Sequence, residues 1–308
     1  MKVIMYHYIQ SYNSEYPNFR FLDFENFKKQ LDYFNSNYGF VFKKEWLNFV
    51  NNGTLPPNKG KILLTFDDGL KCHYDFVFPE LEKRNLWGLF FIPTFSYLKN
   101  KILDVHRIHI LCGAFTGKEL LNELLQLIEE EMVLESKVKE FKNKTYKCQS
   151  NDEGVTQFKQ LLNYFIDNNF RTTIINALCK KFNYKLYPEN FYMNKSNLKE
   201  LCDRGHLIGS HTVSHPVMSS LNKYKQNLQI KNSFETLKAY NLITDKIYCH
   251  PYGGFHSFNK DTENLLKEEG VKYSFNVEAR EIVADDYEKS MQFLPRFDCN
   301  LFKYGKAS

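Results

Sequence analysis

The segment at residues 61–69 reads K-I-L-L-T-F-D-D-G, and it decides the fold class. An apolar run of this kind is typical of a buried strand, and here it ends in two carboxylates, Asp67 and Asp68. Residues 76–85 have the apolar spacing of a helix, and residues 87–92 form a second apolar run that Pro93 closes. A strand, a helix and a second strand in this order predict an α/β fold built from βαβ units.

The same alternation extends over both ends of the chain. We expect further strands at residues 3–6, 39–42, 206–210, 247–250 and 272–277, and helices at residues 24–38, 197–204, 221–240 and 260–269. The middle of the chain lacks a convincing strand and has helical spacing at residues 118–141, 158–166 and 171–182, after an expected loop at residues 104–109. We therefore expect a single domain over residues 1–308, interrupted by a mainly helical insertion at residues 96–196.

The composition is that of an ordinary globular protein. Of the 308 residues, 43% are hydrophobic and 25% are charged, a balance that excludes a disordered chain. The net charge is +5, but the basic residues are scattered, which argues against a nucleic-acid partner. The start, MKVIMYHYIQ, lacks the apolar core of a signal peptide, and no stretch reaches the roughly 18 apolar residues of a membrane span. We expect a cytoplasmic protein with at most peripheral membrane contact. The sequence does not indicate whether the protein is a monomer or an oligomer.

The cysteines point to a reducing compartment. They are odd in number and widely spaced, and no C-x-x-C occurs, which argues against a disulfide framework and against a cysteine zinc site. The residues are Cys72, Cys112, Cys148, Cys179, Cys202, Cys249 and Cys299.

Three groups of polar residues follow predicted strands. Asp67 and Asp68 end one strand, where adjacent side chains are expected on opposite sides of the chain. H-T-V-S-H at residues 211–215 places two histidines on one face if the segment is helical, a pairing that suits one metal ion. H-P-Y-G-G at residues 250–254 has glycines that let backbone amides approach a ligand. Taken singly, each group also fits a plain turn or a helix cap.

Together and in this order, the three groups resemble the motifs of the polysaccharide deacetylase family, the NodB-homology carbohydrate esterases. T-F-D-D-G at residues 65–69 resembles the first motif of that family, H-T-V-S-H the second, and H-P-Y-G at residues 250–253 a variant of the third. The opening M-Y-H-Y-I at residues 5–9 is similar to the first strand of the family. The resemblance covers residues 1–95 and 197–300 and leaves out the insertion.

The resemblance implies a fold, a cofactor and a reaction. The fold would be a distorted (β/α) barrel of about seven strands, and the cofactor one divalent metal ion, commonly Zn²⁺. The reaction would be hydrolysis of the N-acetyl group of an amino sugar. The residues that match the family's motifs are Asp68, His211 and His215 as metal ligands, Asp67 as general base, the Tyr252 amide as oxyanion donor, and His250 and Gly253 in the same substrate-side loop.

The chemistry of amide hydrolysis agrees with these roles. A metal with three protein ligands activates a water, and a neighbouring carboxylate removes its proton. A backbone N–H helps to hold the tetrahedral oxyanion.

The sequence departs from the family pattern at two places. The arginine that usually opens the third motif and braces the base is replaced by Cys249, and we expect Arg296 to take over that task. The late histidine that protonates the leaving amine has no match. We select His106 as the general acid, with His109 and His250 as alternatives.

The most favoured function is therefore a metal-dependent hydrolase that deacetylates an N-acetylated sugar. Without a signal peptide, a nucleotide- or lipid-linked sugar in the biosynthesis of lipopolysaccharide, capsule or another surface glycan fits better than an extracellular polymer. The alternatives are a deformylase or other C–N amide hydrolase on the same fold, and a non-catalytic carbohydrate-binding protein.

Overall fold

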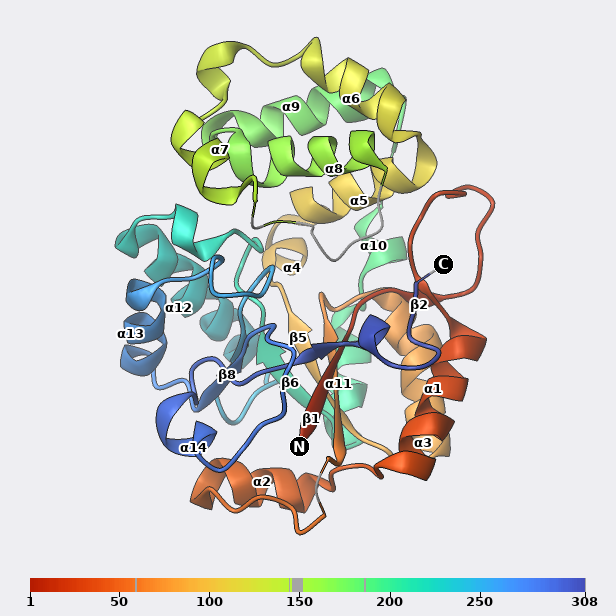
Figure 1. Ribbon diagram of the computed structural model, residues 1–308, viewed down its shortest axis with the longest axis vertical. Coiled ribbons are helices and arrows are strands. Elements are labelled where there is room, and N and C mark those ends of the chain that lie inside the picture. The colour runs from red at the N-terminus through yellow and green to blue at the C-terminus, as the bar shows by residue number, and fades with distance from the viewer. Residues whose placement is uncertain (59, 144, 146–151, 186, 308) are drawn as a thin grey trace. The chain divides into compact units, whose positions relative to one another are not determined.

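A seven-stranded parallel sheet organises the larger part of the chain in the computed structural model (Figure 1). The model describes residues 1–58, 60–143, 145, 152–185 and 187–307. The strand order is β8-β7-β6-β5-β4-β1-β9. The bounds are β1 Lys2–Tyr6, β4 Ile62–Asp67, β5 Gly88–Ile92, β6 Leu207–Ser210, β7 Ile247–Cys249, β8 Tyr273–Phe275 and β9 Phe297–Asp298. The sheet curls into an incomplete barrel, so the predicted distorted barrel of about seven strands is confirmed.

The chain divides into two compact units. The first comprises residues Met1–Ser11, Phe21–Asn100 and Glu189–Ser308 and contains the sheet, and the second comprises Tyr12–Arg20 and Lys101–Pro188. The second unit is helical and lies within the expected insertion, apart from residues 12–20, which the sequence analysis did not assign to it. The interpretation of residues 1–308 as one interrupted domain stays a prediction.

Helices and short segments complete the first unit. Its helices are α1 Phe24–Asn37, α2 Lys43–Asn52, α3 Phe78–Lys83, α4 Phe95–Lys99, α11 Lys195–Asp203, α12 Lys223–Ala239, α13 Lys260–Glu268 and α14 Asp286–Lys289. Between these helices lie three short helical turns, η1 His73–Val77, η4 Met218–Ser220 and η5 Cys299–Leu301. A small sheet pairs β2 Ile9–Gln10 with β3 Leu22–Asp23. Helix α10 Pro188–Phe191 begins where the chain passes from the second unit back to the first.

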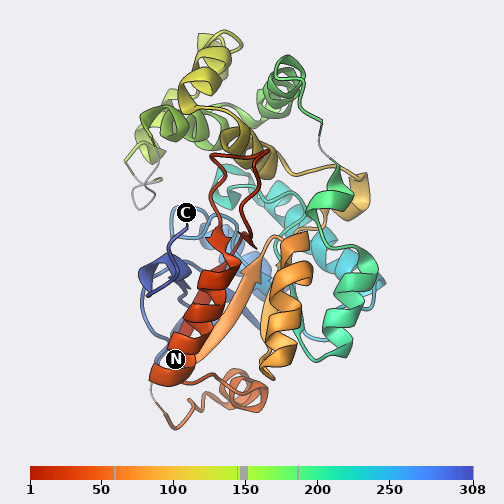
Figure 2. The ribbon, with the colours of Figure 1, turned by 90° about the vertical axis from the view of Figure 1, so that its right-hand side faces the viewer.

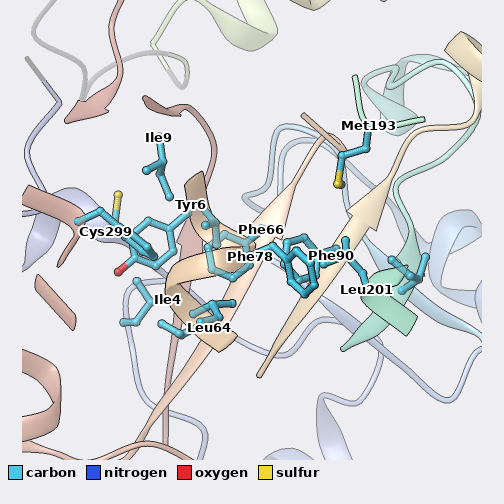
Figure 3. Close-up of a cluster of buried hydrophobic side chains, with 14 of the residues drawn as sticks. Ile4, Tyr6, Ile9, Leu64, Phe66, Phe78, Phe90, Met193, Leu201 and Cys299 are labelled. Atoms are coloured by element: carbon cyan, nitrogen blue, oxygen red, sulfur yellow. The ribbon is translucent and has the colours of Figure 1, made fainter. Parts of the chain in front are cut away.

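Both faces of the sheet are buried, which explains the continuous apolar runs in the sequence. Alternate residues of the strands point outwards, where Tyr6, Phe66 and Phe90 pack under α1, α3 and α11 (Figures 2 and 3). The intervening residues, such as Phe91 and Phe275, point into the barrel. There they meet side chains of α2, which the sequence analysis did not predict.

The segment after β8 brings the chain back across the open side of the barrel. The Ser274 N–H of β8 donates to the carbonyl of Met291, and the Leu294 N–H donates back to the carbonyl of Ser274. The Glu278 N–H donates to the carbonyl of Arg296. The next residue, Phe297, pairs with Ile4 of β1. The backbone between residues 291 and 298 therefore links the two edges of the sheet, and Arg296 lies on this closing segment.

The second unit is built from helices that share one apolar core. The helices are α5 Asp104–Ala114, α6 Gly117–Leu125, α7 Glu135–Phe141, α8 Glu153–Gln160 and α9 Asn168–Lys181, with the turns η2 Glu130–Met132 and η3 Leu161–Phe165. Within the described residues none of the helices of either unit is long and apolar enough to span a bilayer. The six described cysteines are free thiols, and Cys148 lies outside the described residues.

Three expectations about secondary structure are wrong. Residues 39–42 contain an isolated bridge from Phe40 to Ile62 rather than a strand. The single helix expected at residues 118–141 is two helices, because Met132 and Leu134 form backbone hydrogen bonds with residues 165–167 instead of continuing a helix. The loop expected at residues 104–109 is the start of α5, whose Ile108 and Leu111 are buried at helical spacing.

A buried histidine predicts how acid affects the stability of the first unit. The His206 Nδ1 accepts a hydrogen bond from the Gly88 N–H at 3.1 Å, so the ring must be neutral at that nitrogen. Burial, reinforced by the charge of Lys43, lowers the pKa of His206 from 6.5 to about 4, although the half-exposed Glu82 lies 3.6 Å from Nε2. The unfolded chain therefore binds more protons below pH 6.5, and the stability that neutral His206 contributes is lost as the pH falls from 6.5 to about 4.

We expect His206→Gln to weaken this pH dependence, because a glutamine oxygen can accept the same N–H bond without titrating. The free energy of unfolding of the wild type should fall more steeply between pH 6.5 and 4, by about 1.4 kcal/mol per pH unit more than that of the variant. Urea unfolding at a series of pH values measures both slopes. Equal slopes for the two proteins would show that folding does not lower the pKa of His206.

Candidate active site

The carboxyl ends of the parallel strands bring the three sequence motifs to one edge of the barrel. Asp67 ends β4, His211 follows β6, and Cys249 ends β7 directly before the 250–254 turn. All three side chains are buried. Loops at this edge of a parallel sheet are where α/β proteins commonly build their sites.

A carboxylate and two imidazoles converge at this edge. The Asp68 Oδ1 lies 3.7 Å from the His211 Nε2 and 3.6 Å from the His215 Nε2. Ligand atoms about 2.0–2.1 Å from a tetrahedral Zn²⁺ are about 3.4 Å apart, close to the spacing seen here. The His211 Nδ1 lies 2.9 Å from the Cys249 carbonyl oxygen, to which it donates, so Nε2 presents its lone pair towards Asp68. The three residues therefore fit a divalent ion.

A second set of donors lies next to the first but suits a metal less well. It consists of Asp67, His211 and Cys249. Both oxygens of Asp67 already accept hydrogen bonds from Arg296 at 2.8 Å. Burial raises the pKa of the Cys249 thiol well above its ordinary value, so the sulfur stays protonated, whereas metal ligation requires the thiolate.

Arg296 holds Asp67 from inside the barrel. Its two terminal nitrogens donate to Oδ1 and Oδ2 of Asp67, and Nη1 also donates to the Thr65 hydroxyl at 3.1 Å. Nη2 lies 2.9 Å from the sulfur of Cys249, the residue that stands where the family has its arginine. The structure therefore places the Arg296 guanidinium against Asp67.

This ion pair determines the charge of Asp67. Burial by itself would raise the pKa of the carboxyl, but the positive charge and hydrogen bonds of Arg296 outweigh it, and the pKa of Asp67 falls from 3.8 to about 2. The pKa of His211 is also lowered, but here burial is the cause, and it outweighs the two neighbouring carboxylates, which would raise the pKa. At neutral pH the site thus contains an ionised Asp67 beside a neutral His211.

The backbone of the site is unusual at four residues. Asp68, Thr212, His215 and Tyr252 have φ values of 79°, 67°, 54° and 64°, in the left-handed region that such residues rarely adopt. The turn at Asp68 corrects the expectation that the adjacent acids point to opposite sides, because the His7 Nε2 lies 3.9 Å from a carboxylate oxygen of each. Strain of this kind persists only where the surrounding structure enforces it, and it concentrates at functional sites.

The loop after β7 has both structural and site-facing residues. The Tyr252 ring lies against the ring of His215, with centroids 4.9 Å apart. Gly253 has φ +61°, and a Cβ there would lie 2.2 Å from a methyl group of Val277, so this glycine is required by packing. His250 is buried beneath the loop, where its Nε2 lies 2.9 Å from the Gln292 carbonyl oxygen.

His250 supports the loop in a neutral state. Its ring stacks on Phe258 at a centroid distance of 3.9 Å. Burial lowers the pKa of His250 to about 3, so it carries no proton to donate as an imidazolium at neutral pH. This environment disfavours the alternative in which His250 is the general acid.

The structure reveals one site residue that the sequence analysis did not select. His7 follows β1 at the same edge of the sheet, and its half-exposed ring reaches both Asp67 and Asp68. The signal was present, since M-Y-H-Y places a histidine directly after a strand. His106 and His109, the residues chosen instead, lie on α5 of the second unit, and the role of His106 stays a prediction.

Comparisons with known proteins agree with the fold and the motifs. The polysaccharide deacetylase family model matches residues 152–274, which include the second and third motifs. The Streptococcus pyogenes deacetylase PplD, solved in complex with acetate, is 16% identical, and the alignment covers 97% of this chain and 91% of that chain with a TM-score of 0.56. IcaB from Ammonifex degensii is 18% identical, with 96% and 90% covered and a TM-score of 0.56.

A de-N-acetylase from Aggregatibacter actinomycetemcomitans is 14% identical, with 96% and 93% covered and a TM-score of 0.54. No curated protein matches the sequence. The solved structures share the fold with this chain, and the resemblance to the polysaccharide deacetylase family is confirmed. The matching family model, polysaccharide deacetylase, is by its name one of hydrolases of the N-deacetylase type.

The Arg296–Asp67 pair leads to a prediction about stability. Arg296→Met should lower the free energy of unfolding by about 3–5 kcal/mol, because it leaves a buried carboxylate without a partner. The double variant Arg296→Met/Asp67→Asn should recover part of that loss, because its carboxyl charge is gone. Denaturant unfolding of the wild type, of Arg296→Met, of Asp67→Asn and of the double variant completes the double-mutant cycle.

The control for this cycle is Lys289→Met, which breaks an exposed ion pair with Asp285 and should leave stability unchanged. If Arg296→Met were as stable as this control, Asp67 would not depend on the guanidinium.

Proposed function

We propose that this protein is a divalent-metal-dependent hydrolase that removes the N-acetyl group from an amino sugar. The observation that supports this most strongly is the convergence of Asp68, His211 and His215 beside an ionised, arginine-bound Asp67. A bound Zn²⁺ or similar ion would lower the pKa of its water towards about 7 and polarise the amide carbonyl.

The residues of the chain divide the remaining work. Asp67 is anionic at neutral pH and can accept the proton of the attacking water, and Arg296 holds it in place. The backbone N–H of Tyr252, in the turn next to His215, serves to stabilise the tetrahedral oxyanion. The half-exposed His7, whose Nε2 lies 3.9 Å from a carboxylate oxygen of Asp67 and of Asp68, is placed to donate a proton to the leaving amine. His7 therefore becomes the preferred general acid, ahead of His106.

Two other functions compete with this proposal. A deformylase or another C–N amide hydrolase would use the same residues in the same roles and differ only in the acid that it releases. A non-catalytic carbohydrate-binding protein would have no need of a buried carboxylate pair, of an arginine fixed against one of them, or of strained backbone at four site residues. The cost of these features favours an enzyme.

The carrier of the sugar and the pathway belong to the same proposal. A nucleotide- or lipid-linked N-acetylated sugar in surface-glycan biosynthesis, deacetylated in the cytoplasm, stays the prediction made from the sequence. Panels of nucleotide-linked, lipid-linked and polymeric substrates test it directly. Faster turnover of long N-acetylated polymers than of any small conjugate would contradict it.

Metal content and acetate release test the proposed reaction together. The purified protein should hold one divalent ion and release acetate from an N-acetylated amino sugar, and His215→Ala should lose both properties. Elemental analysis measures the metal, and enzymatic assays distinguish acetate from formate. Formate release would favour the deformylase, and full metal occupancy in His215→Ala would show that the ligand assignment is wrong.

The general base and acid can be separated by kinetics. Asp67→Asn should keep the metal but lose about 10²-fold or more in kcat, the usual scale for a missing general base.

His7→Gln should lose the alkaline limb of the kcat/KM profile against pH, because that limb reports the proton held by the acid. The matched variant His106→Gln should keep it. An unchanged profile in His7→Gln together with a lost limb in His106→Gln would assign the acid to α5.

A further inference from the structure

The loop at residues 211–215 carries two of the three metal ligands on strained backbone. His211 continues directly from β6, and the chain then turns through positive φ at Thr212 and again at His215. Within the loop, the His215 N–H donates to the Thr212 hydroxyl at 2.9 Å. On one side of the loop, the Thr212 and Val213 carbonyls accept hydrogen bonds from the backbone N–H groups of residues 94 and 95. Left to itself, a segment of this kind would relax and move the His215 ring away from Asp68.

A glutamine on the neighbouring helix holds the loop from outside. The Gln229 Oε1 accepts hydrogen bonds from the backbone N–H groups of Val213 and Ser214, at 3.1 and 2.9 Å. The Gln229 Nε2 donates to the Ser214 hydroxyl at 2.9 Å. One side-chain amide thus fixes three polar groups that lie between the two ligand histidines in the chain. None of these three bonds involves a histidine ring.

The same helix supports the start of the loop through a chain of hydroxyl groups. The Thr212 N–H donates to the Ser210 hydroxyl at 3.1 Å, and the Ser210 and Ser233 hydroxyls lie 2.6 Å apart. Ser233 donates its own proton to the Ile230 carbonyl at 2.7 Å, so Ser210 must be the donor to Ser233. Helix α12 packs against β6 (Figure 1) and presents Gln229 and Ser233 one helical turn apart on the side of the loop.

We propose that Gln229 is a positioning residue for the metal site: it holds the 211–215 loop in the ligating conformation before the ion binds. This rests on the proposed function only in assuming that Asp68, His211 and His215 bind a divalent ion. If the loop is already held, the ion does not have to supply the free energy of ordering it, and its affinity rises accordingly. Hydrogen-bond partners of this kind around a metal site typically contribute about 10–100-fold in metal affinity.

The test measures Zn²⁺ affinity by competition with a chromogenic chelator, a readout that does not depend on turnover. Gln229→Met keeps the length and volume of the side chain but removes both the acceptor and the donor. It should weaken Zn²⁺ binding by about 10-fold or more. Gln229→Glu keeps an acceptor for the two N–H groups and should stay within a few-fold of the wild type. Gln157→Met makes the same substitution at an exposed glutamine of the second unit and should leave the affinity unchanged.

A shorter side chain provides a second route in case Gln229→Met fails to fold. Gln229→Asn keeps a polar amide but draws it back by one methylene, so it should fold and still weaken Zn²⁺ binding by about 10-fold. Circular dichroism and the melting temperature of the metal-free proteins show that each variant is folded.

The outcomes separate this inference from the proposed function. Wild-type Zn²⁺ affinity in folded Gln229→Met or Gln229→Asn would overturn the positioning role, even if His215→Ala abolishes binding. A loss of affinity in Gln229→Glu as large as in Gln229→Met would also overturn it, because the acceptor would then have no special part. If the wild-type protein itself binds no divalent ion, the proposed function fails first.

Discussion

The ion pair between Arg296 and Asp67 is the interaction on which the rest of the site depends. It lies inside the barrel, where both side chains are almost fully excluded from solvent, and both pairs of donor and acceptor atoms are 2.8 Å apart. A charge buried in this way is tolerated only with a matching partner and good geometry. Arg296 comes from the segment that runs from β8 to β9, beside β1, so the pair joins closure of the barrel to the charge of Asp67.

The pair also separates the tasks of two adjacent acids. Asp67 ends β4 and is directed into the barrel, where both of its oxygens are engaged by Arg296. Asp68 turns through a positive φ and meets the two histidines of the 211–215 loop. An acid that is already bound by a guanidinium is a poor metal ligand but a well-positioned proton acceptor. Under the proposed function, identical side chains thus acquire different roles from their surroundings, which is a common way to build acid–base sites.

Much of the fold and part of the site could be predicted from the sequence, and the reasons are local. Apolar runs that end in Asp67, Ser210 and Cys249 specify buried parallel strands, and the motifs at their ends follow from chain order. Arg296 could be named because its family counterpart was missing.

What the sequence did not indicate depends on tertiary structure. Gln229 lies in the middle of a helix whose pattern predicts only which face is buried, and its contact with residues 213 and 214 follows from how α12 packs on β6. His7 was passed over because a single histidine after a strand has no partner in sequence, although the fold places it 3.9 Å from both acids. The start of α5 was taken for a loop because its polar residues obscured the apolar spacing of Ile108 and Leu111.

X-ray absorption at the zinc edge of the zinc-loaded protein tests the central assignment most directly. The two possible donor sets differ in one atom type, since one contains the sulfur of Cys249 and the other only nitrogen and oxygen. Our account predicts a first shell of nitrogen and oxygen atoms alone, at about 2.0–2.1 Å, with the imidazole scattering pattern of His211 and His215. A sulfur at about 2.3 Å would place the ion between Asp67, His211 and Cys249 and contradict the division of roles between the two acids.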